Sequence, residues 1–281
     1  MSNPVLVSGA SGVLGRAIVS AFVVAGAPVR QAVRDLKKAK PGVDSARWDY
    51  ADPATFAPAL AGTGGLLLIA PSLDANAPAE LAPAVAAAKA ARVAQIVLIS
   101  AFGVNQNEQA ALRIVEHIVI DSGVPYTILR PNFFMENFSE GFLAGGIREK
   151  HGIFLAAGDG KTSFISVRDI AAVVLAAFQE PLTGAEFDLT GPEALDHFAV
   201  AKIIAQVSGR AVGYTPLTEA QMVAGAQTEG MPEPAIAYVN TLYSVVRAGY
   251  LAAVTPDFER ITGRQPISFA AFAQANALAW K

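Results

Sequence analysis

Short apolar runs alternate with longer segments of helical periodicity through the first half of the chain. Strand-length runs lie at 4–8, 29–33, 46–48, 66–70, 95–100 and 126–130, and helical patterns fall near 13–25, 53–61, 76–92 and 107–122. Runs such as LLLIA and IVLIS are apolar at almost every position, as in strands that helices cover on both faces. The alternation predicts βαβ units and an α/β fold with a Rossmann-like, doubly wound parallel sheet.

The regular alternation of strand and helix patterns ends after Arg130. The stretch PNFFMENFSEGFLAGGI is rich in aromatic residues, FISVRDIAAVVLAAFQ predicts a strand that leads into a helix, and further helical patterns lie around 233–251 and 268–280. We expect a dinucleotide-binding domain at 1–131, with 160–180 packing back on it. A smaller C-terminal substrate lobe is expected from 132–159 and 185–281.

Composition narrows the classes of protein that fit. Of the 281 residues, 53% are hydrophobic and 16% are charged, which indicates a substantial folded core. The absence of cysteine excludes thiol nucleophiles and cysteine-ligated metals, and the three histidines lack ligand-like spacing, so no metal site is expected. A net charge of −3 gives no footprint for nucleic acid, and no apolar run is long enough for a membrane span. We expect a cytoplasmic protein, and its oligomeric state stays open, a homodimer included.

Three glycines follow the first predicted strand, in PVLVSGASGVLGRAIV. A glycine at the strand end permits unusual backbone angles, a second leaves room for a pyrophosphate, and a third lets the next helix pack closely. The helix N-terminus then offers free N–H groups to the phosphates. The Gly-x-x-Gly-x-x-Gly spacing in this context predicts a dinucleotide site, with a ligand-free tight turn as the alternative. The residues expected to bind are Gly9, Ser11, Gly12, Val13, Leu14 and Gly15.

The residues that follow the second predicted strand bear on the choice of cofactor. A carboxylate there binds the ribose 2′-hydroxyl of NAD, whereas an arginine accommodates the 2′-phosphate of NADP. The sequence has Arg34 followed by Asp35, with Lys38 one turn later. Two cations against one carboxylate favour a phosphate, which guanidinium binds through forked, charge-assisted bonds. We expect NADPH and leave NAD open; the alternative is that RDLKKAK is a solvated helix start.

At this point the sequence resembles the atypical short-chain dehydrogenase/reductases, and more narrowly the NmrA-like group with NAD(P)H:quinone reductases and triphenylmethane dye reductases. The motifs that carry the resemblance span nearly the whole chain: GASGVLG, VRDLKKA, WDYADPATFAPAL, VEHIVIDSGVPYTILRPNFFMENF and ITGRQPISFAAFAQANALAW. The resemblance implies an NAD(P)H-dependent oxidoreductase. It also implies further cofactor contacts, which are Asp49 at the adenine, Ala70 and Pro71, Ser100, Ala101 and Phe102, and Pro131, Asn132 and Phe133 near the nicotinamide.

The sequence lacks the usual acid of this superfamily, in which the tyrosine of Tyr-x-x-x-Lys protonates the nascent alkoxide. None of the six tyrosines has a lysine four residues later, and Leu112 occupies a position where some relatives carry lysine or histidine. Reduction of a simple ketone leaves an alkoxide whose conjugate acid has a pKa of roughly 16, like that of water. Reduction of a quinone leaves a phenolate-like oxygen whose conjugate acid has a pKa of about 10. Compared with the alkoxide, this lowers the free energy needed to form the anion by at most about 8 kcal/mol. We therefore expect hydride transfer to a quinone-like or conjugated aromatic acceptor, with the catalytic residues unassigned.

Flat apolar side chains and amides are the residues that such an acceptor would contact. The candidates are Phe102, Phe134, Asn137, Phe138 and Tyr238, with ordinary core packing as the alternative for the phenylalanines. His117 falls off the apolar stripe of its predicted helix and is expected at the surface, and Arg168 and Asp169 are expected in structural ion pairs.

Two other functions stay open at this stage. The first is a non-catalytic NmrA-like sensor that holds NADP and regulates a partner protein. The second is a nucleotide-sugar epimerase or dehydratase, which fits less well because its chemistry also uses the absent tyrosine.

Overall fold

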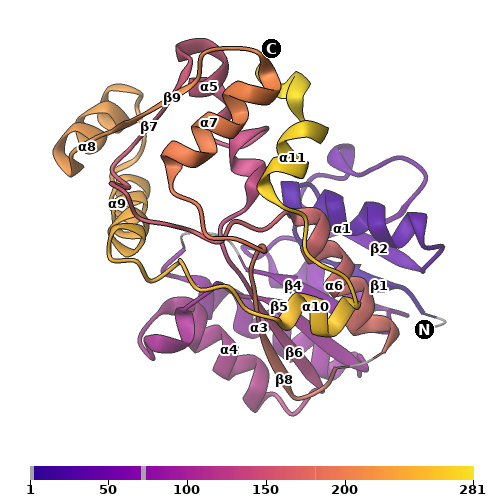
Figure 1. The fold of residues 1–281 in the computed structure, drawn as a ribbon. Coiled ribbons are helices and arrows are strands. Elements are labelled where there is room, and N and C mark those ends of the chain that lie inside the picture. The colour runs from indigo at the N-terminus through magenta and orange to yellow at the C-terminus, as the bar shows by residue number, and fades with distance from the viewer. Residues whose placement is uncertain (1–2, 71–73, 181) are drawn as a thin grey trace. The chain divides into compact units, whose positions relative to one another are not determined.

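Seven parallel strands form one sheet whose central strands are buried on both faces, as their continuous apolar sequences require. The strands are β1 (Val5–Val7), β2 (Val29–Val33), β3 (Asp44–Arg47), β4 (Gly65–Ile69), β5 (Gln95–Ile99), β6 (Tyr126–Pro131) and β8 (Ala185–Leu189). Their order is β3-β2-β1-β4-β5-β6-β8 (Figure 1). The computed structural model describes residues 3–70, 74–180 and 182–281. The predicted α/β class with a doubly wound parallel sheet is confirmed.

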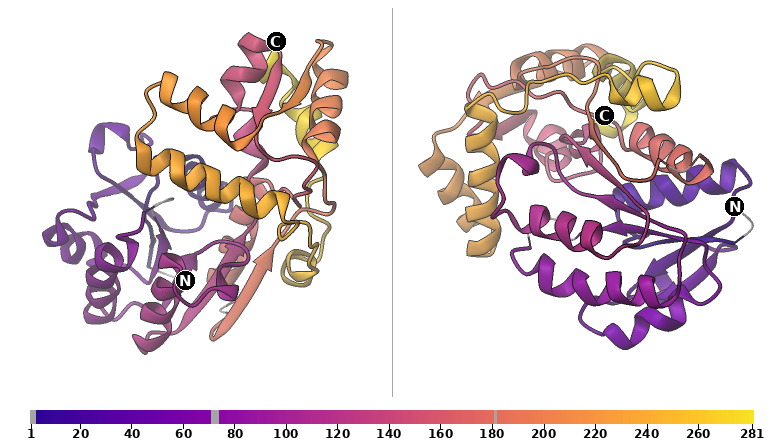
Figure 2. Two further views of the ribbon diagram at one scale, coloured as in Figure 1. Left: turned by 90° about the vertical axis from the view of Figure 1, so that its left-hand side faces the viewer. Right: turned by 90° about the horizontal axis from the view of Figure 1, so that it is seen from below.

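Helices cover both faces of this sheet (Figure 2). Helices α1 (Val13–Val24) and α6 (Val167–Gln179) pack together on one face, and α2 (Phe56–Leu60), α3 (Ala77–Ala90) and α4 (Ala111–Asp121) pack on the other. Phe22 of α1 meets Phe178 of α6 edge-on, with ring centroids 6.1 Å apart. Gly65 makes room for that contact, because a Cβ there would lie 2.7 Å from the Phe178 ring.

The order of the strands creates a switch point between β1 and β4. The chain passes from β1 to β2 and β3 on one side, then returns to β4 on the other side. Loops that leave neighbouring strands in opposite directions open a crevice at the carboxyl ends of the strands, where open α/β sheets bind ligands. The glycine-rich stretch begins at the carboxyl end of β1, so it lies at this point.

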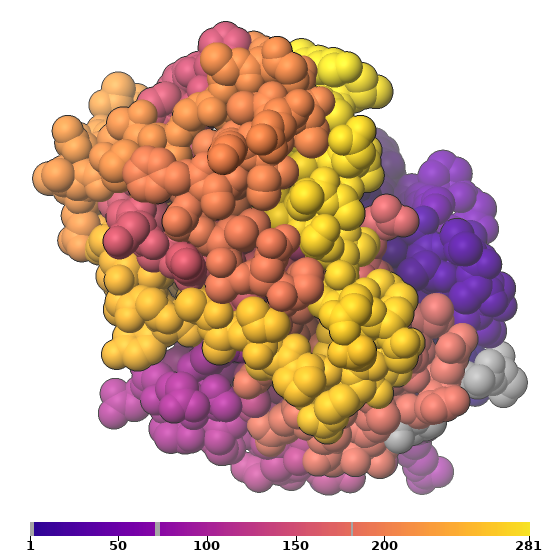
Figure 3. Space-filling view, in the orientation of Figure 1, coloured from indigo at the N-terminus to yellow at the C-terminus, as the bar shows by residue number. Residues whose placement is uncertain are grey.

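The second unit is a separate assembly of helices around an aromatic core. It contains the parallel pair β7 (Gly152–Leu155) and β9 (Gly213–Pro216) and helices α5 (Ala144–Lys150), α7 (His197–Ser208), α8 (Glu219–Thr228), α9 (Glu233–Arg247) and α11 (Phe269–Ala275). Phe138 packs edge-on against Phe164 and Phe269, with centroids 5.2 and 5.4 Å away. The Trp280 indole donates to the Phe138 carbonyl at 2.6 Å. Helix α11 packs against α7, where yellow meets orange in Figure 3.

Each unit is assembled from separate stretches of chain. The first comprises Met1–Pro131, Val167–Leu189 and Asp257–Arg264, and the second comprises Asn132–Ser166, Thr190–Pro256 and Gln265–Lys281. The sequence-based division, which gives 185–281 to the substrate lobe, stays a prediction. In the structure β8 extends the sheet, and α10 (Asp257–Thr262) contacts α6 and β8. Among the described residues no helix is both long and apolar enough to cross a bilayer.

Candidate functional site

The loop between β1 and α1 has a shape that depends on its glycines. Gly9 has a φ of +61°, in the left-handed region that other residues seldom adopt. The Gly12 N–H donates to the Gly9 carbonyl at 3.0 Å and closes the turn. A Cβ on Gly15 would lie 2.2 Å from that carbonyl oxygen, so only glycine lets the helix approach so closely. A Cβ on Gly12 would meet the same oxygen at 3.4 Å and no other described atom within 4 Å, so the space beside Gly12 is open.

Helix α1 begins at this loop without a capping side chain. Its N-cap is Gly12, and Val13 and Leu14 open the first turn, whose N–H groups have no partner inside the helix. Arg16 Nη1 donates to the Ser11 carbonyl at 2.8 Å and fixes the peptide before the helix. An uncapped N-terminus with its positive dipole end is suited to an anion such as a diphosphate.

A hollow of about 270 Å³ opens beside the loop, lined by Ser11, Arg34, Asp35 and Lys38. Arg34 follows β2 directly, and Lys38 ends the 3₁₀ turn Leu36–Lys38. Asp35 caps that turn, because its Oδ1 accepts the Lys37 N–H at 2.9 Å. The carboxylate is thus engaged by its own backbone, while the two cations give the hollow positive charge.

A half-buried tyrosine, Tyr50, joins the carboxyl ends of β1 and β4. The Tyr50 hydroxyl donates to the Ile69 carbonyl at 3.0 Å and lies 3.1 Å from Ser8 Oγ, which accepts the Ile69 N–H at 2.8 Å. Burial raises the pKa of Tyr50 to about 12, so the hydroxyl keeps its proton at neutral pH. Ser8 and Ile69 each end a strand, so these bonds fix the start of the two loops that follow.

Asp49, Ala70 and Pro71 were expected beside the cofactor at this edge of the sheet. The Asp49 carboxylate accepts the Ala51 N–H at 3.2 Å and lies 3.7 Å from Arg47 Nη2. Ala70 directly follows β4 and is buried. Pro71 lies outside the described residues.

The loop after β5 is fixed along the end of β6. The Ser100 N–H donates to the Leu129 carbonyl at 2.8 Å, and the Phe102 N–H donates to the Pro131 carbonyl at 3.1 Å. Ser100 is buried, whereas Ala101 and Phe102 are half-buried. The structure therefore brings those predicted residues of the first unit that it describes to the carboxyl edge of one sheet.

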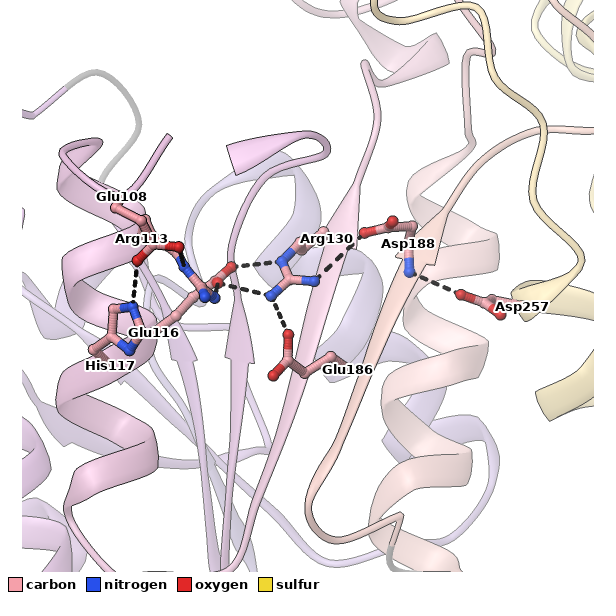
Figure 4. Close-up of polar contacts among 8 residues, drawn as sticks. All are labelled: Glu108, Arg113, Glu116, His117, Arg130, Glu186, Asp188 and Asp257. Carbon is pink, nitrogen blue, oxygen red and sulfur yellow. Dashed lines mark hydrogen bonds and ion pairs between the residues drawn. The ribbon is translucent and has the colours of Figure 1, made fainter. Parts of the chain in front are cut away.

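A network of charged residues lies near this edge and joins α4, β6, β8 and α10 (Figure 4). Arg130 binds Glu116 through two bonds, Nε to Oε1 and Nη2 to Oε2, each 2.8 Å long. Arg130 also contacts Glu186, and its Nη1 lies 3.7 Å from Asp188 Oδ1. The Asp188 N–H donates to Asp257 Oδ2 at 2.9 Å. The end of β6 is thus held by ion pairs on both sides.

The outer part of the network reaches solvent. Arg113 donates to Glu116 at 2.8 Å and to Glu108 at 3.0 Å, and His117 Nε2 lies 2.8 Å from Glu108 Oε2. Burial alone would raise the pKa of Glu116, but Arg130 and the neighbouring donors outweigh burial and lower it. His117 is partly exposed, as predicted for a surface residue. An arginine in the middle of this chain of contacts excludes it as a proton relay, because guanidinium keeps its proton.

In the second unit, the Asn132 side chain is held by its own surroundings. Its Nδ2 donates to Ser163 Oγ at 2.8 Å and to the Leu251 carbonyl at 2.9 Å, while its Oδ1 accepts the Phe133 N–H at 2.9 Å. The Phe133 carbonyl accepts the Ile165 N–H at 2.9 Å. These bonds fix the backbone that carries the Phe133 ring.

The five residues proposed to contact the acceptor are divided between the two units. Phe102 belongs to the first unit, and the other four belong to the second. Phe134, Asn137 and Tyr238 are half-buried, so part of each is open to solvent. Phe138 is 1% exposed and lies in the aromatic core, which favours the core-packing alternative for it.

Several residues of the site carry little or no sequence signal. Arg16 and Tyr50 were not identified, because nothing in a local pattern shows that their side chains reach a loop carbonyl or two distant strands. Arg130 had a signal, since a charge at the end of an apolar strand needs a buried partner. Asp169, expected in an ion pair, is buried against Arg264 at 2.9 Å. The described residues hold no cluster of three or more His, Asp or Glu suited to a metal ion.

Comparison with known proteins agrees with this geometry. Residues 9–181 match a family described as NAD(P)H-binding. An NAD(P)H azoreductase of Xenophilus azovorans is 33% identical over 98% of this chain and 99% of its own length. An agroclavine dehydrogenase of Claviceps fusiformis is 38% identical over 83% of each chain. The NADPH complex of the quinone oxidoreductase QOR2 of Escherichia coli has a TM-score of 0.85 and 26% identity, covering 96% of this chain and 99% of that one.

These matches test the cofactor and the enzyme class that were expected from the sequence. The family description confirms the nicotinamide cofactor, and the names of the relatives bear out an NAD(P)H-dependent oxidoreductase. The azoreductase match spans nearly both chains, so it covers the second unit as well as the sheet. The chain belongs to the NAD(P)H-binding family.

Proposed function

We propose that the protein transfers hydride from NADPH to a quinone-like or other conjugated aromatic acceptor. Bound NADPH supplies the hydride, and the chain supplies the binding sites and the exclusion of water. The uncapped start of α1 and the open space beside Gly12 suit the diphosphate. The relatives named azoreductase and quinone oxidoreductase support an acceptor with extended conjugation.

The observation that carries the choice of NADPH over NADH is the position of Asp35. One of its oxygens, Oδ1, accepts the Lys37 N–H, so the carboxylate is less available to the ribose hydroxyls. Arg34, Lys38 and Ser11 line the adjacent hollow. A guanidinium and an ammonium beside a hydroxyl form a favourable site for a 2′-phosphate.

The missing Tyr-x-x-x-Lys pair supports the acceptor class. An acceptor whose reduced form is a stabilised anion needs less acid assistance than a ketone. Proximity and desolvation then supply most of the rate enhancement. A quinone, an azo compound and an enone all meet this requirement, so all three classes belong in the assay.

The test compares NADPH and NADH oxidation, followed at 340 nm, with quinones, azo dyes and enones as acceptors. We expect Arg34→Ala to raise the KM for NADPH about tenfold or more and to leave the KM for NADH nearly unchanged. Lys37→Ala is the matched control, because it removes a neighbouring cation that does not line the hollow. An unchanged preference for NADPH in Arg34→Ala would overturn the assignment of the phosphate site.

The same measurements separate the enzyme from a redox sensor. Turnover of any acceptor class supports the enzyme. Equal affinity for NADPH and NADP⁺ without turnover of any acceptor would instead favour a sensor that acts through a partner protein.

A further inference from the structure

Tyr243 on α9 is a buried phenol whose hydroxyl has no hydrogen-bond partner among the described residues. The residue is 1% exposed. Its ring lies edge-on to Phe133, with centroids 6.3 Å apart, and 6.1 Å from the His197 ring. Buried hydroxyls nearly always find a partner, because an unmade hydrogen bond costs stability. The Tyr243 oxygen is not among the fully buried polar atoms that lack a partner, so it reaches accessible space, where a ligand can accept its hydrogen bond.

A neighbouring tyrosine shows what a purely structural hydroxyl does in this cluster. Tyr214 also packs against His197, with centroids 5.4 Å apart. Its hydroxyl donates to the Leu155 carbonyl at 3.1 Å. Tyr243 lies in the same aromatic surroundings without such a bond.

A second polar group without a partner lies one turn earlier on α9. The Oδ1 of Asn240 is buried and has no hydrogen-bond partner among the described residues. Residues three apart share one face of a helix, so the amide and the phenol face the same way. One face of α9 thus presents a free acceptor on Asn240 and a free donor on Tyr243, whose ring contacts Phe133, the residue expected near the nicotinamide.

We propose that Tyr243 donates a hydrogen bond to the acceptor atom on which negative charge develops, and that the Asn240 amide holds a second polar group of the same molecule. The ligand is a flat aromatic compound with a carbonyl or comparable heteroatom, placed against Phe133. The inference rests on the proposed function and identifies residues for its acceptor site.

The chemistry balances without a proton from the tyrosine. The acceptor gains a hydride, which is two electrons and a proton, and one of its oxygens becomes an anion while the nucleotide is oxidised. The Tyr243 O–H bond stays intact and stabilises that anion, which afterwards takes a proton from water. Burial raises the pKa of Tyr243, so the phenol remains a donor throughout. A donor aimed at the atom on which charge develops is an efficient catalytic device.

The test is Tyr243→Phe, with Tyr250→Phe as the matched control because Tyr250 is an exposed tyrosine of the same unit. With 1,4-naphthoquinone as acceptor, we expect kcat to fall about 100-fold in Tyr243→Phe, with the KM for NADPH unchanged. The melting temperature should stay the same or rise, because no protein hydrogen bond is lost and an unpaired hydroxyl is removed. A structural tyrosine would give the opposite result, a lower melting temperature.

A readout that needs neither cofactor nor turnover is the binding of 4-nitrophenolate, followed by the shift of its visible absorption. We expect at least tenfold weaker binding in Tyr243→Phe and parent-like binding in Tyr250→Phe. Asn240→Leu should raise the KM for the quinone and leave the melting temperature unchanged.

The outcomes separate this inference from the function it rests on. Parent-like kcat and parent-like 4-nitrophenolate binding in Tyr243→Phe would overturn the inference and leave the reductase intact, and so would a marked loss of thermal stability. If the parent protein reduces no acceptor, the proposed function fails, and the 4-nitrophenolate titration still decides whether Tyr243 binds oxyanions.

Discussion

Replacement of His197 by phenylalanine should make the stability of the second unit less dependent on pH below 6.5. His197 is 1% exposed, and its Nδ1 has no hydrogen-bond partner among the described residues. Its ring is surrounded by Phe138, Phe164, Tyr214 and Tyr243. An imidazolium there would lose its hydration and gain no bond in return.

The magnitude follows from the pKa of this histidine. Burial lowers the pKa of His197 from its ordinary 6.5 to about 4, although Asp196 acts in the opposite direction. Above pH 6.5 neither the folded nor the unfolded chain binds the proton, so the full stability is present. Between pH 6.5 and 4 only the unfolded chain binds it, and stability is lost as the pH falls. A difference of about 2.5 units, at 1.36 kcal/mol per unit, corresponds to a loss of about 3 kcal/mol.

The assay can follow the second unit alone. The chain has two tryptophans, Trp48 in the first unit and Trp280 in the second. In a Trp48→Phe background, the fluorescence of buried Trp280 reports unfolding of the second unit in urea. Unfolding curves at pH 7.5, 6.5, 5.5 and 4.5 then give the free energy of unfolding against pH.

The parent and His197→Phe should differ in the slope of the free energy of unfolding against pH. His197→Phe should match the parent to within about 1 kcal/mol at pH 7.5, since the swap conserves an aromatic ring. It should exceed the parent by roughly 2 to 3 kcal/mol at pH 4.5. His117→Gln, which removes a partly exposed histidine and keeps the buried one, should retain the parent's slope. Equal slopes in the parent and His197→Phe would refute the argument from burial.

Four further substitutions test the first unit. Gly15→Ala should lower the melting temperature strongly because its Cβ meets a carbonyl at 2.2 Å, whereas Gly12→Ala should keep the fold and weaken NADPH binding, measured by nucleotide fluorescence. Glu116→Gln should destabilise the protein by about 3 kcal/mol in urea, since it leaves the buried Arg130 guanidinium without its two-bond partner; a loss below about 1 kcal/mol would mean that the other carboxylates compensate. Tyr50→Phe should cost about 1 to 2 kcal/mol of stability and also weaken NADPH binding, and an unchanged affinity would show that the tyrosine only packs.

Strands β1, β4 and β5 were predictable because each is an almost continuous apolar run, whereas β2 (VRQAV) and β3 (DSAR) carry polar residues. Strand β8 was not predictable, because Glu186 and Asp188 interrupt its apolar residues and both face Arg130. The pairing of β7 with β9 joins segments far apart in sequence, which no local pattern reveals. The strand predicted just before α6 is wrong, because the stretch forms only an isolated bridge between Ile165 and Phe134.

The candidate site also has features that could be predicted from the sequence and features that could not. The glycine loop could be predicted because the backbone at Gly9 and the close packing at Gly15 require glycine, which is visible in the sequence. The environment of Asp35 could not, since a carboxylate that caps a turn and one that binds a ribose look alike in sequence. Whether an aromatic residue belongs to the core, as Phe138 does, depends on partners such as Phe269 that lie more than 100 residues away.

The chain leaves the first unit and returns to it at neighbouring points. The Ile165 N–H bonds to the Phe133 carbonyl, just beyond the exit at Pro131 and just before the return at Val167. The next exit, after Leu189, adjoins the return at Asp257, since the Asp188 N–H bonds to Asp257. Two short splices, together with removal of Gln265–Lys281, could therefore excise the whole second unit and rebuild the sheet, with α6 and β8, as a minimal nucleotide-binding protein. A simple truncation at Pro131 would instead bare the edge of β6 and the face beneath α6.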